Sequence, residues 1–407
     1  MTRSGPRLIV ALAFVAFVSL GLPDGVLGVA WPSIRQSFSR PLSHLGVLLA
    51  SGISGYLLSS FLGGQIVRAV GVGKLLLGSS LVVAAALALF SLTGTWWGVV
   101  AAAAIGGLGA GAVDAGINTF AASRFSPRVV NWLHACWGIG ATTGPLLMTF
   151  VLARGRPWQT GYAVLGVAMA LLSLLFLFTL RLWTIAPTPG PGATAPETPP
   201  PTASIGEALA RPAVWVQLSL FFLYCGIESA AGQLLYSLLT ESRGVSPRDA
   251  GLATGGYWAS LTAGRVVFGQ LSASLGALAI LRIGLGTAPI AAALLWWNPS
   301  TAVSLAGAAL LGFALAPVFP TLISVTPQRV GAYFAPQAVG FQVAAANLGI
   351  ALLPGAVGVL ARRYGLEILC VYLVAASVAL FALHELAVAT TRRGSATYRA
   401  DTSAAPA

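Results

Sequence analysis

The sequence is dominated by a succession of apolar runs, each long enough to cross a lipid bilayer. A spanning helix needs about 20 consecutive, mostly apolar residues. Hydrophobic residues make up 57% of the chain and charged residues only 8%, whereas about a quarter of a soluble domain is charged. We therefore predict an all-α membrane protein with twelve transmembrane helices. The expected spans are 8–31, 44–67, 72–93, 97–122, 131–153, 158–183, 212–239, 247–270, 276–297, 301–325, 335–361 and 365–389.

One polar interval, 184–211, divides these runs into six and six. It is rich in Pro, Thr and Gly, and such a composition favours a flexible linker because little of it can be buried. The predicted domains are an N-terminal six-helix bundle over 1–183, a C-terminal bundle over 212–390 and a tail over 391–407. The halves are faintly similar, since Gly140 and Pro145 recur at the same spacing as Gly349 and Pro354. Two six-span halves in parallel are typical of secondary transporters.

The basic residues indicate topology rather than a nucleic-acid partner. The net charge is +12, but Lys and Arg come singly or in pairs between apolar runs, with no stripe that follows a phosphate backbone. Their excess on one set of loops predicts cytoplasmic termini and a cytoplasmic linker, in the cell (inner) membrane. Arg3 and Arg7 precede the first run, and no cleavage-site pattern follows, so we expect that run to be retained as a span.

The most informative run contains the stretch from Gly106 to Asn118, G-G-L-G-A-G-A-V-D-A-G-I-N. Asp114 lies inside an apolar span, where a charge costs about 2.5–3.5 kcal/mol, so such a residue usually faces a cavity and serves a function. Asn118 lies four residues later and leaves the same helical face. The glycines permit close approach of a neighbouring helix. We expect a polar stripe that faces an aqueous site.

Two other acidic residues, Asp24 and Glu228, also lie well inside predicted spans, and no basic residue is expected deep in any span. A carboxyl group that loses and regains its proton as its access to water changes is what proton coupling requires. We therefore predict proton-coupling roles for Asp24, Asp114 and Glu228, with the first two as the titrating pair. The alternative for Asp24 is a carboxyl group that hydrogen-bonds backbone at a helix break beside Pro23 and Gly25.

Amide, imidazole and aromatic side chains accompany these acids on several spans. Amides and carboxylates suit the hydrogen bonds of a hydroxylated ligand, and aromatic faces suit its rings. Taken singly, each such residue is more often packing or interhelical hydrogen bonding, so the prediction depends on their convergence. The predicted substrate-binding residues are Trp31, Asn118, His134, Trp137, Gln233, Tyr236, Trp258, Gln342 and Asn347.

These segments resemble the major facilitator superfamily, and within it the proton-coupled fucose, galactose and glucose permeases. The resemblance covers about residues 8–390. Its most specific parts are D-A-G-I-N at 114–118, N-W-L-H-A-C-W-G-I-G-A-T-T-G-P at 131–145, F-F-L-Y-C-G-I-E-S-A-A-G-Q at 221–233, A-G-R-V-V-F-G at 263–269 and A-P-V-F-P-T at 316–321. It implies the major facilitator fold, with alternating access to a central site. It also implies that Asp24 and Asp114 serve proton coupling and sugar binding, with Asn118 beside them and Glu228 on span 7.

The sequence departs from this family at three places. The span-4 acid is Asp rather than Glu, so it is one methylene shorter. The loop 64–74 reads G-Q-I-V-R-A-V-G-V-G-K, with Arg68 where the superfamily usually has Asp and Ala69 where it has Arg. The corresponding loop after span 8 lacks charges too. We therefore expect an altered inside gate around Arg68 and Lys74, with flexible points at Pro317 and Pro320, where proline removes a helical hydrogen bond.

The predicted function is secondary active transport: proton-coupled uptake of a sugar or similar neutral hydroxylated solute. The main alternative is proton-driven efflux of drugs or metabolites by the same fold. The efflux motif of span 5 ends G-P-x-x-G-G, but here Met148 and Thr149 replace the glycine pair. An enzyme has little support, and no metal site is predicted, since the three cysteines and three histidines show no ligand-type spacing. We expect no cofactor beyond a proton gradient, lipid as the surroundings and a monomer.

Overall fold

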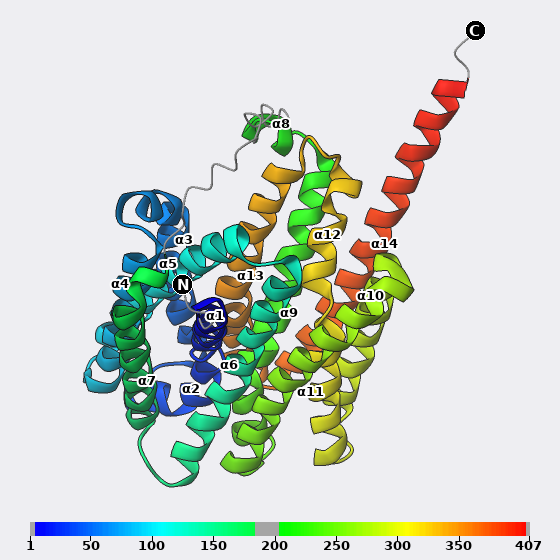
Figure 1. The fold of residues 1–407 in the computed structure, drawn as a ribbon. Helices are drawn as coiled ribbons and strands as arrows, with labels where there is room; N and C mark the ends of the chain where they lie inside the picture. The colour runs from blue at the N-terminus through cyan, green and yellow to red at the C-terminus, as the bar shows by residue number, and fades with distance from the viewer. Residues whose placement is uncertain (1–4, 184–202, 404–407) are drawn as a thin grey trace.

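The computed structural model describes residues 5–183 and 203–403, and all its regular elements are helical (Figure 1). The first half contains α1 (Gly5–Gly21), α2 (Val26–Ser37), η1 (Leu42–His44), α3 (Leu45–Val70), α4 (Val72–Leu92), α5 (Trp96–Arg124), α6 (Pro127–Ala153), α7 (Trp158–Thr179) and η2 (Leu180–Leu182). The second contains α8 (Ile205–Leu209), α9 (Pro212–Ser237), the π-helical turn η3 (Leu238–Ser242), α10 (Pro247–Trp297), α11 (Thr301–Leu315), α12 (Val318–Val330), α13 (Ala335–Tyr364) and α14 (Ile368–Ser403).

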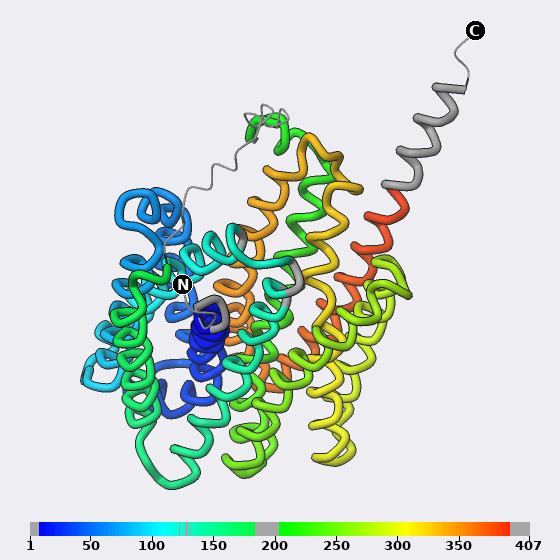
Figure 2. The backbone as a smooth tube through the Cα atoms, in the orientation of Figure 1, coloured from blue at the N-terminus to red at the C-terminus, as the bar shows by residue number. Residues whose placement is uncertain are grey.

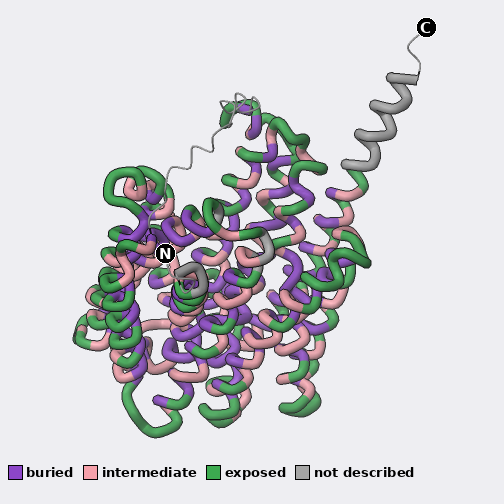
Figure 3. The backbone as a smooth tube through the Cα atoms, viewed as in Figure 1, coloured by how far each residue is buried: buried purple, intermediate pink, exposed green. Residues whose placement is uncertain are grey.

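The protein is a multi-pass membrane protein. Within the described residues, 11 helical segments are long and apolar enough to cross a membrane. Large apolar side chains such as Phe61, Leu92 and Phe178 are exposed on the outside of the molecule, where green exposed backbone alternates with purple buried backbone along the helices (Figure 3). An apolar surface of this kind suits lipid rather than water.

The predicted helices are found, with one kind of difference in continuity. The 51-residue element α10 is two helices that meet at a kink at Gly276 (φ 72°, ψ 158°), in agreement with the separate expected spans 247–270 and 276–297. The first and tenth expected spans, in contrast, are each broken, at Leu22–Gly25 and at Ala316–Pro317.

Local sequence explains several helix ends. Thr95, Ser246 and Ser300 accept hydrogen bonds from backbone N–H groups in the first turns of α5, α10 and α11, which satisfies donors that a helix leaves unpaired. Gly71 and Gly365 end α3 and α13 at positive φ, a conformation that costs glycine little.

The predicted linker and tail differ in part from the structure. Residues 184–202 of the linker lie outside the described residues. Its last part is ordered, because Ser204 and Glu207 form a reciprocal cap at the start of the short helix α8 and Ala203 donates a backbone hydrogen bond to Tyr333. The predicted tail begins within α14, whose helix continues to Ser403.

The helices gather into an N-terminal and a C-terminal half, which lie side by side in Figure 2 (blue to green and green to red). Within the halves, α3, α4, α5 and α7 pack together, as do α9, α10, α11, α13 and α14. Between the halves, the main contacts are those of α3 and η1 with α13, α6 with α10, and α2 with α9. The candidate site lies on helices that form these junctions.

Candidate functional site

Asp24 lies in the break between α1 and α2. Pro23 has no N–H to donate, and the chain passes from α1 to α2 through turns. Two glycines let the chain around this break pack closely against α6 and α9. A Cβ on Gly21 would collide with the backbone of α6, and one on Gly28 with that of α9. The Asp24 residue is exposed, although it lies where both halves meet.

Asp24 receives hydrogen bonds from each half of the molecule. Trp137 Nε1 on α6 donates to Asp24 Oδ2 (2.8 Å), and Gln233 Nε2 on α9 donates to the Asp24 backbone carbonyl (2.7 Å). The partner of the carboxyl group is thus a tryptophan, rather than the backbone of the alternative interpretation. The Gln233 bond joins the N-terminal half to the C-terminal half at this point.

Asp114 is held by neutral donors within the N-terminal half. Asn118 Nδ2 donates to Asp114 Oδ1 (2.8 Å), and Tyr56 OH on α3 donates to Oδ2 (2.6 Å). The prediction that Asp114 and Asn118 share a face is confirmed. The close approach expected from the glycines is also found, since a Cβ on Gly107 or Gly111 would collide with the backbone of α3.

Glu228 has a basic neighbour inside the helical region, although the sequence predicts no basic residue deep in any span. Arg265 on α10 places one guanidinium nitrogen 4.0 Å from Glu228 Oε2, with both side chains largely buried. The Glu228 carboxyl group also accepts a hydrogen bond from Tyr224, and its backbone carbonyl accepts one from Tyr257 OH (3.0 Å).

Trp137 connects these groups across the interface between the halves. Besides donating to Asp24, its ring lies under the Arg265 guanidinium (4.8 Å to the centroid) and meets the Trp258 ring edge-on (6.2 Å, 79°). The structure thus brings together an ordered set of polar contacts from Asp24 through Trp137 and Arg265 to Glu228. We call these four residues the central network.

Other predicted binding residues lie on the helices that carry the central network. His134 is exposed on α6, with its ring against Phe17 (5.0 Å). Trp258 is buried on α10, and Tyr236 is buried on α9, two turns from Glu228. Such aromatic and amide groups can stack on and hydrogen-bond a hydroxylated solute.

Three predicted binding residues have other surroundings. Trp31 is fully buried inside the N-terminal half, against Trp96 (6.3 Å). Gln342 is fully buried and pairs with Thr326 (2.9 Å), while Asn347 donates to a carbonyl of its own helix. The structure does not bring these side chains into contact with the four residues of the central network.

The predicted gate residues lie at helix ends and at a break. Arg68 and Lys74 lie on either side of the turn between α3 and α4. Pro317 occupies the break between α11 and α12, beside Gly284 of α10, and Pro320 lies in the first turn of α12.

The residues that sequence reasoning missed are Tyr56, Tyr224, Tyr257 and Arg265. Tyr224 carries a signal, because it lies one turn before Glu228. Arg265 carries another, because it lies within the predicted span 247–270. Tyr56 approaches Asp114 from a different helix, and no spacing in the sequence connects the two. In the described part of the chain, no three His, Cys, Asp or Glu residues are grouped as a metal site would require.

Comparisons with known proteins identify the family of this chain. The family model described as Major Facilitator Superfamily matches residues 12–239 and 218–404. The "Glucose/mannose transporter GlcP" of Bacillus subtilis (strain 168) is 19% identical, over 85% of this chain and 86% of its own length. The "Sodium-dependent glucose transporter 1" of Homo sapiens is 24% identical, over 86% of this chain and 73% of its own length.

Solved structures of transporters share the fold. A bacterial homolog of the human lysosomal transporter Spinster, in an inward-facing and unoccupied conformation, has a TM-score of 0.74 at 16% identity, over 98% of this chain and 99% of its own. A mutant of the nucleoside transporter NupG has a TM-score of 0.75 at 13% identity, over 92% of this chain and 98% of its own. These relatives are transporters rather than enzymes. The chain belongs to the major facilitator superfamily of membrane transporters.

Proposed function

We propose that this transporter takes up a monosaccharide or a similar neutral, hydroxylated solute together with a proton. The observation that carries the proposal is the central network. Acidic groups of both halves, Asp24 and Glu228, are joined there through one tryptophan and one arginine. Loading or removing one proton changes the charge of this network, so protonation can bias how the halves meet.

Twelve crossings follow if α10 is two spans that meet at Gly276. The length of α10 and the positive φ of Gly276 support this division. The Pro-rich interval after the sixth span then separates the twelve crossings into six and six. In the proposed topology both termini and the linker are cytoplasmic, and the two six-helix bundles rock about the central network in a cytoplasmic membrane. One chain encloses a pathway, so a monomer suffices.

The proposed substrate site lies beside Trp137 and Trp258, with Asn118 and Gln233 as amide partners. Gln233 Oε1 is buried and lacks a hydrogen-bond partner in the described part of the chain, so a sugar hydroxyl placed there would satisfy it. We leave Trp31 and Gln342 out of the proposed set because their surroundings are packing and a closed hydrogen-bonded pair. The names of the glucose transporters among the relatives support a sugar as the substrate class.

Purified protein in liposomes provides the test. Labelled monosaccharides and a cationic dye are offered under three conditions: a pH gradient with the inside alkaline, an inward sodium gradient, and no gradient. We expect at least one sugar to accumulate only under the pH gradient, and a protonophore to abolish that accumulation. Accumulation driven by sodium would overturn proton coupling, and exclusion of the dye without uptake of any sugar would favour the efflux alternative.

A further inference from the structure

The two halves meet tightly at one end of the interface. Near the start of α3 and the end of α13, a Cβ added to Gly46 would lie 2.8 Å from Gly355 Cα, and one added to Gly358 would lie 2.8 Å from Ser43 Cα. At the same end, Gly251 near the start of α10 packs against Thr149 near the end of α6. We call this the closed face; it carries the connections after α2, α6, η3 and α13.

An ion pair joins the halves on the closed face. Arg35 in the last turn of α2 donates to the carboxylate of Glu241 in η3. Both side chains are about a quarter exposed, at 28% and 27%, and they line a cavity of about 580 Å³ together with Pro32, Gln36, Ser39 and Arg40. The pair is therefore reached by water while it bridges the two halves.

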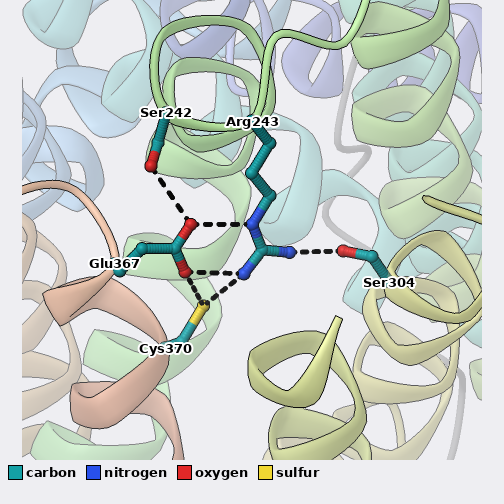
Figure 4. A network of polar contacts seen from close by, with 5 residues as sticks. All are labelled: Ser242, Arg243, Ser304, Glu367 and Cys370. Atoms are coloured by element: carbon teal, nitrogen blue, oxygen red, sulfur yellow. Dashed lines mark hydrogen bonds and ion pairs between the residues drawn. The ribbon is translucent and has the colours of Figure 1, made fainter. Parts of the chain in front are cut away.

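The two residues that follow Glu241 are fixed within the C-terminal half (Figure 4). Ser242 Oγ and Arg243 Nε both donate to Glu367 Oε1 (3.1 and 2.8 Å), and a second guanidinium nitrogen donates to Oε2 (2.7 Å). The Arg243 side chain is only 6% exposed, and it also reaches Ser304 of α11 and Cys370 of α14. Glu367 lies between α13 and α14, so this network ties η3 to α11, to α14 and to the connection between α13 and α14.

We infer that the Arg35–Glu241 pair locks the closed face, and that Glu367 is the positioning residue that holds Glu241 ready through Ser242 and Arg243. The inference rests on the alternating access of the proposed function, because a lock matters only if the halves separate here. Exposed ion pairs are weak because two flexible side chains must be ordered. Fixing the turn that carries Glu241 lowers the cost of ordering the Glu241 side chain. The result is a contact that is weak enough to break in each cycle.

Thr149→Cys reports on the opening of the closed face. Thr149 is 4% exposed and is covered by Gly251 of the other half, so its cysteine reacts with a maleimide only when α6 and α10 separate. The protein is studied in lipid nanodiscs, where both faces meet solvent, so the readout needs neither a substrate nor a known orientation. Labelling of the native Cys136, Cys225 and Cys370 is subtracted by running each variant without the reporter.

Glu241→Gln should raise the labelling rate by about fivefold, the effect of losing a contact at the upper end of exposed ion pairs. The charge reversal Arg35→Glu with Glu241→Arg should return the rate to the parent value. Glu385→Gln is the matched control, because Glu385 is held bidentately by Arg282 of its own half, and it should leave the rate unchanged. If Glu241→Gln does not fold, Arg35→Gln serves in its place.

The positioning role is tested by combination. Glu367→Gln should raise the labelling rate in the parent but add nothing in the Arg35→Gln background, where Glu241 has already lost its partner. Rates that stay at the parent value in both Arg35→Gln and Glu241→Gln would overturn the lock. An additive effect of Glu367→Gln would overturn the positioning role. Failure of sugar uptake in liposomes would leave these rates unchanged, so the two proposals fail separately.

Discussion

Asp114 is the residue whose surroundings bear most directly on proton coupling, because both of its carboxylate oxygens meet neutral donors, Tyr56 and Asn118. Asp114→Asn keeps the shape and an oxygen that can accept from Tyr56, but it cannot titrate. We expect the variant to lose gradient-driven accumulation and to keep counterflow exchange, which needs no net proton movement. Radiolabelled uptake and counterflow in the same liposomes measure both.

Glu385→Gln is the control for this variant, since it also removes one carboxyl group but lies far along α14, in an ion pair with Arg282. It should retain accumulation. If Asp114→Asn still concentrates substrate against its gradient, Asp114 is not a coupling residue.

A substitution at Trp137 gives a second prediction for a single residue, because it can remove the hydrogen bond to Asp24 and keep an aromatic ring. Trp137→Phe removes the donor to Asp24 and keeps an aromatic face for Arg265. Hydrogen bonds to charged groups contribute about 1.5–3 kcal/mol, so we expect the apparent KM to rise about tenfold or more. Trp215→Phe is the comparison, since it also removes one indole donor, but Trp215 Nε1 donates to the Leu209 carbonyl near the start of α9, outside the central network; a rise of equal size there would contradict the role of the Asp24 bond.

The sequence predicted those site features that depend on spacing within one helix. Asp114 and Asn118 are four residues apart, so their shared face follows from helical geometry. The contacts of Tyr56 and Arg265 join different helices, and helical periodicity says nothing about which rotation brings two helices face to face. Gln342 shows the same limit. The sequence predicts that its amide group binds the substrate, whereas in the structure that group donates a hydrogen bond to Thr326 of a neighbouring helix.

At the scale of the elements, hydrophobic runs located the helices but not every break in them. The breaks at Pro23 and Pro317 carry proline, which removes a donor and is visible in the sequence. The break at Gly276 lies where the sequence predicts the boundary between the spans 247–270 and 276–297, and glycine adopts the positive φ found there at little cost. The short helix α8 was missed inside a Pro-rich interval because five residues, Ile205–Leu209, carry little hydrophobic periodicity.

Close packing between α3 and α13 gives a prediction at this scale. A Cβ on Gly355 would lie 3.0 Å from Gly46 Cα of the other half, so Gly355→Leu places a side chain where backbones touch. We expect it to wedge the closed face apart, raising the labelling of Thr149→Cys and reducing transport. Gly340→Leu on the same helix, where an added Cβ meets nothing within 4 Å, should change neither; similar effects of the two substitutions would contradict the wedge.

For the whole molecule, the sequence indicated two halves and a membrane but could not indicate how the halves meet. The linker composition and the spacing of spans are local properties, whereas the closed face depends on pairs such as Gly46 with Gly355 and Arg35 with Glu241. Members of such pairs lie hundreds of residues apart, and each looks ordinary alone. In the sequence, Arg35 and Glu241 are single charges near the ends of apolar runs, and the structure makes them a bridge between the halves.

The ion pair that fixes η3 also gives the stability of the whole molecule a defined pH dependence. Hydrogen bonding from Arg243 holds the pKa of Glu367 below its ordinary value of 4.5. A carboxyl group with a lowered pKa stabilises the folded protein fully above its unfolded pKa and loses this contribution as pH falls through the folded value. Glu367→Gln removes the titrating group. The thermal unfolding midpoint of the parent should therefore exceed that of Glu367→Gln by a constant margin from about pH 7 to 5, and the margin should shrink below about pH 4.5, where Glu367 takes up its proton. A margin that persists unchanged to about pH 3 would mean that the charge of Glu367 does not stabilise the fold, and the support for Glu241 would then come from packing around Arg243 alone.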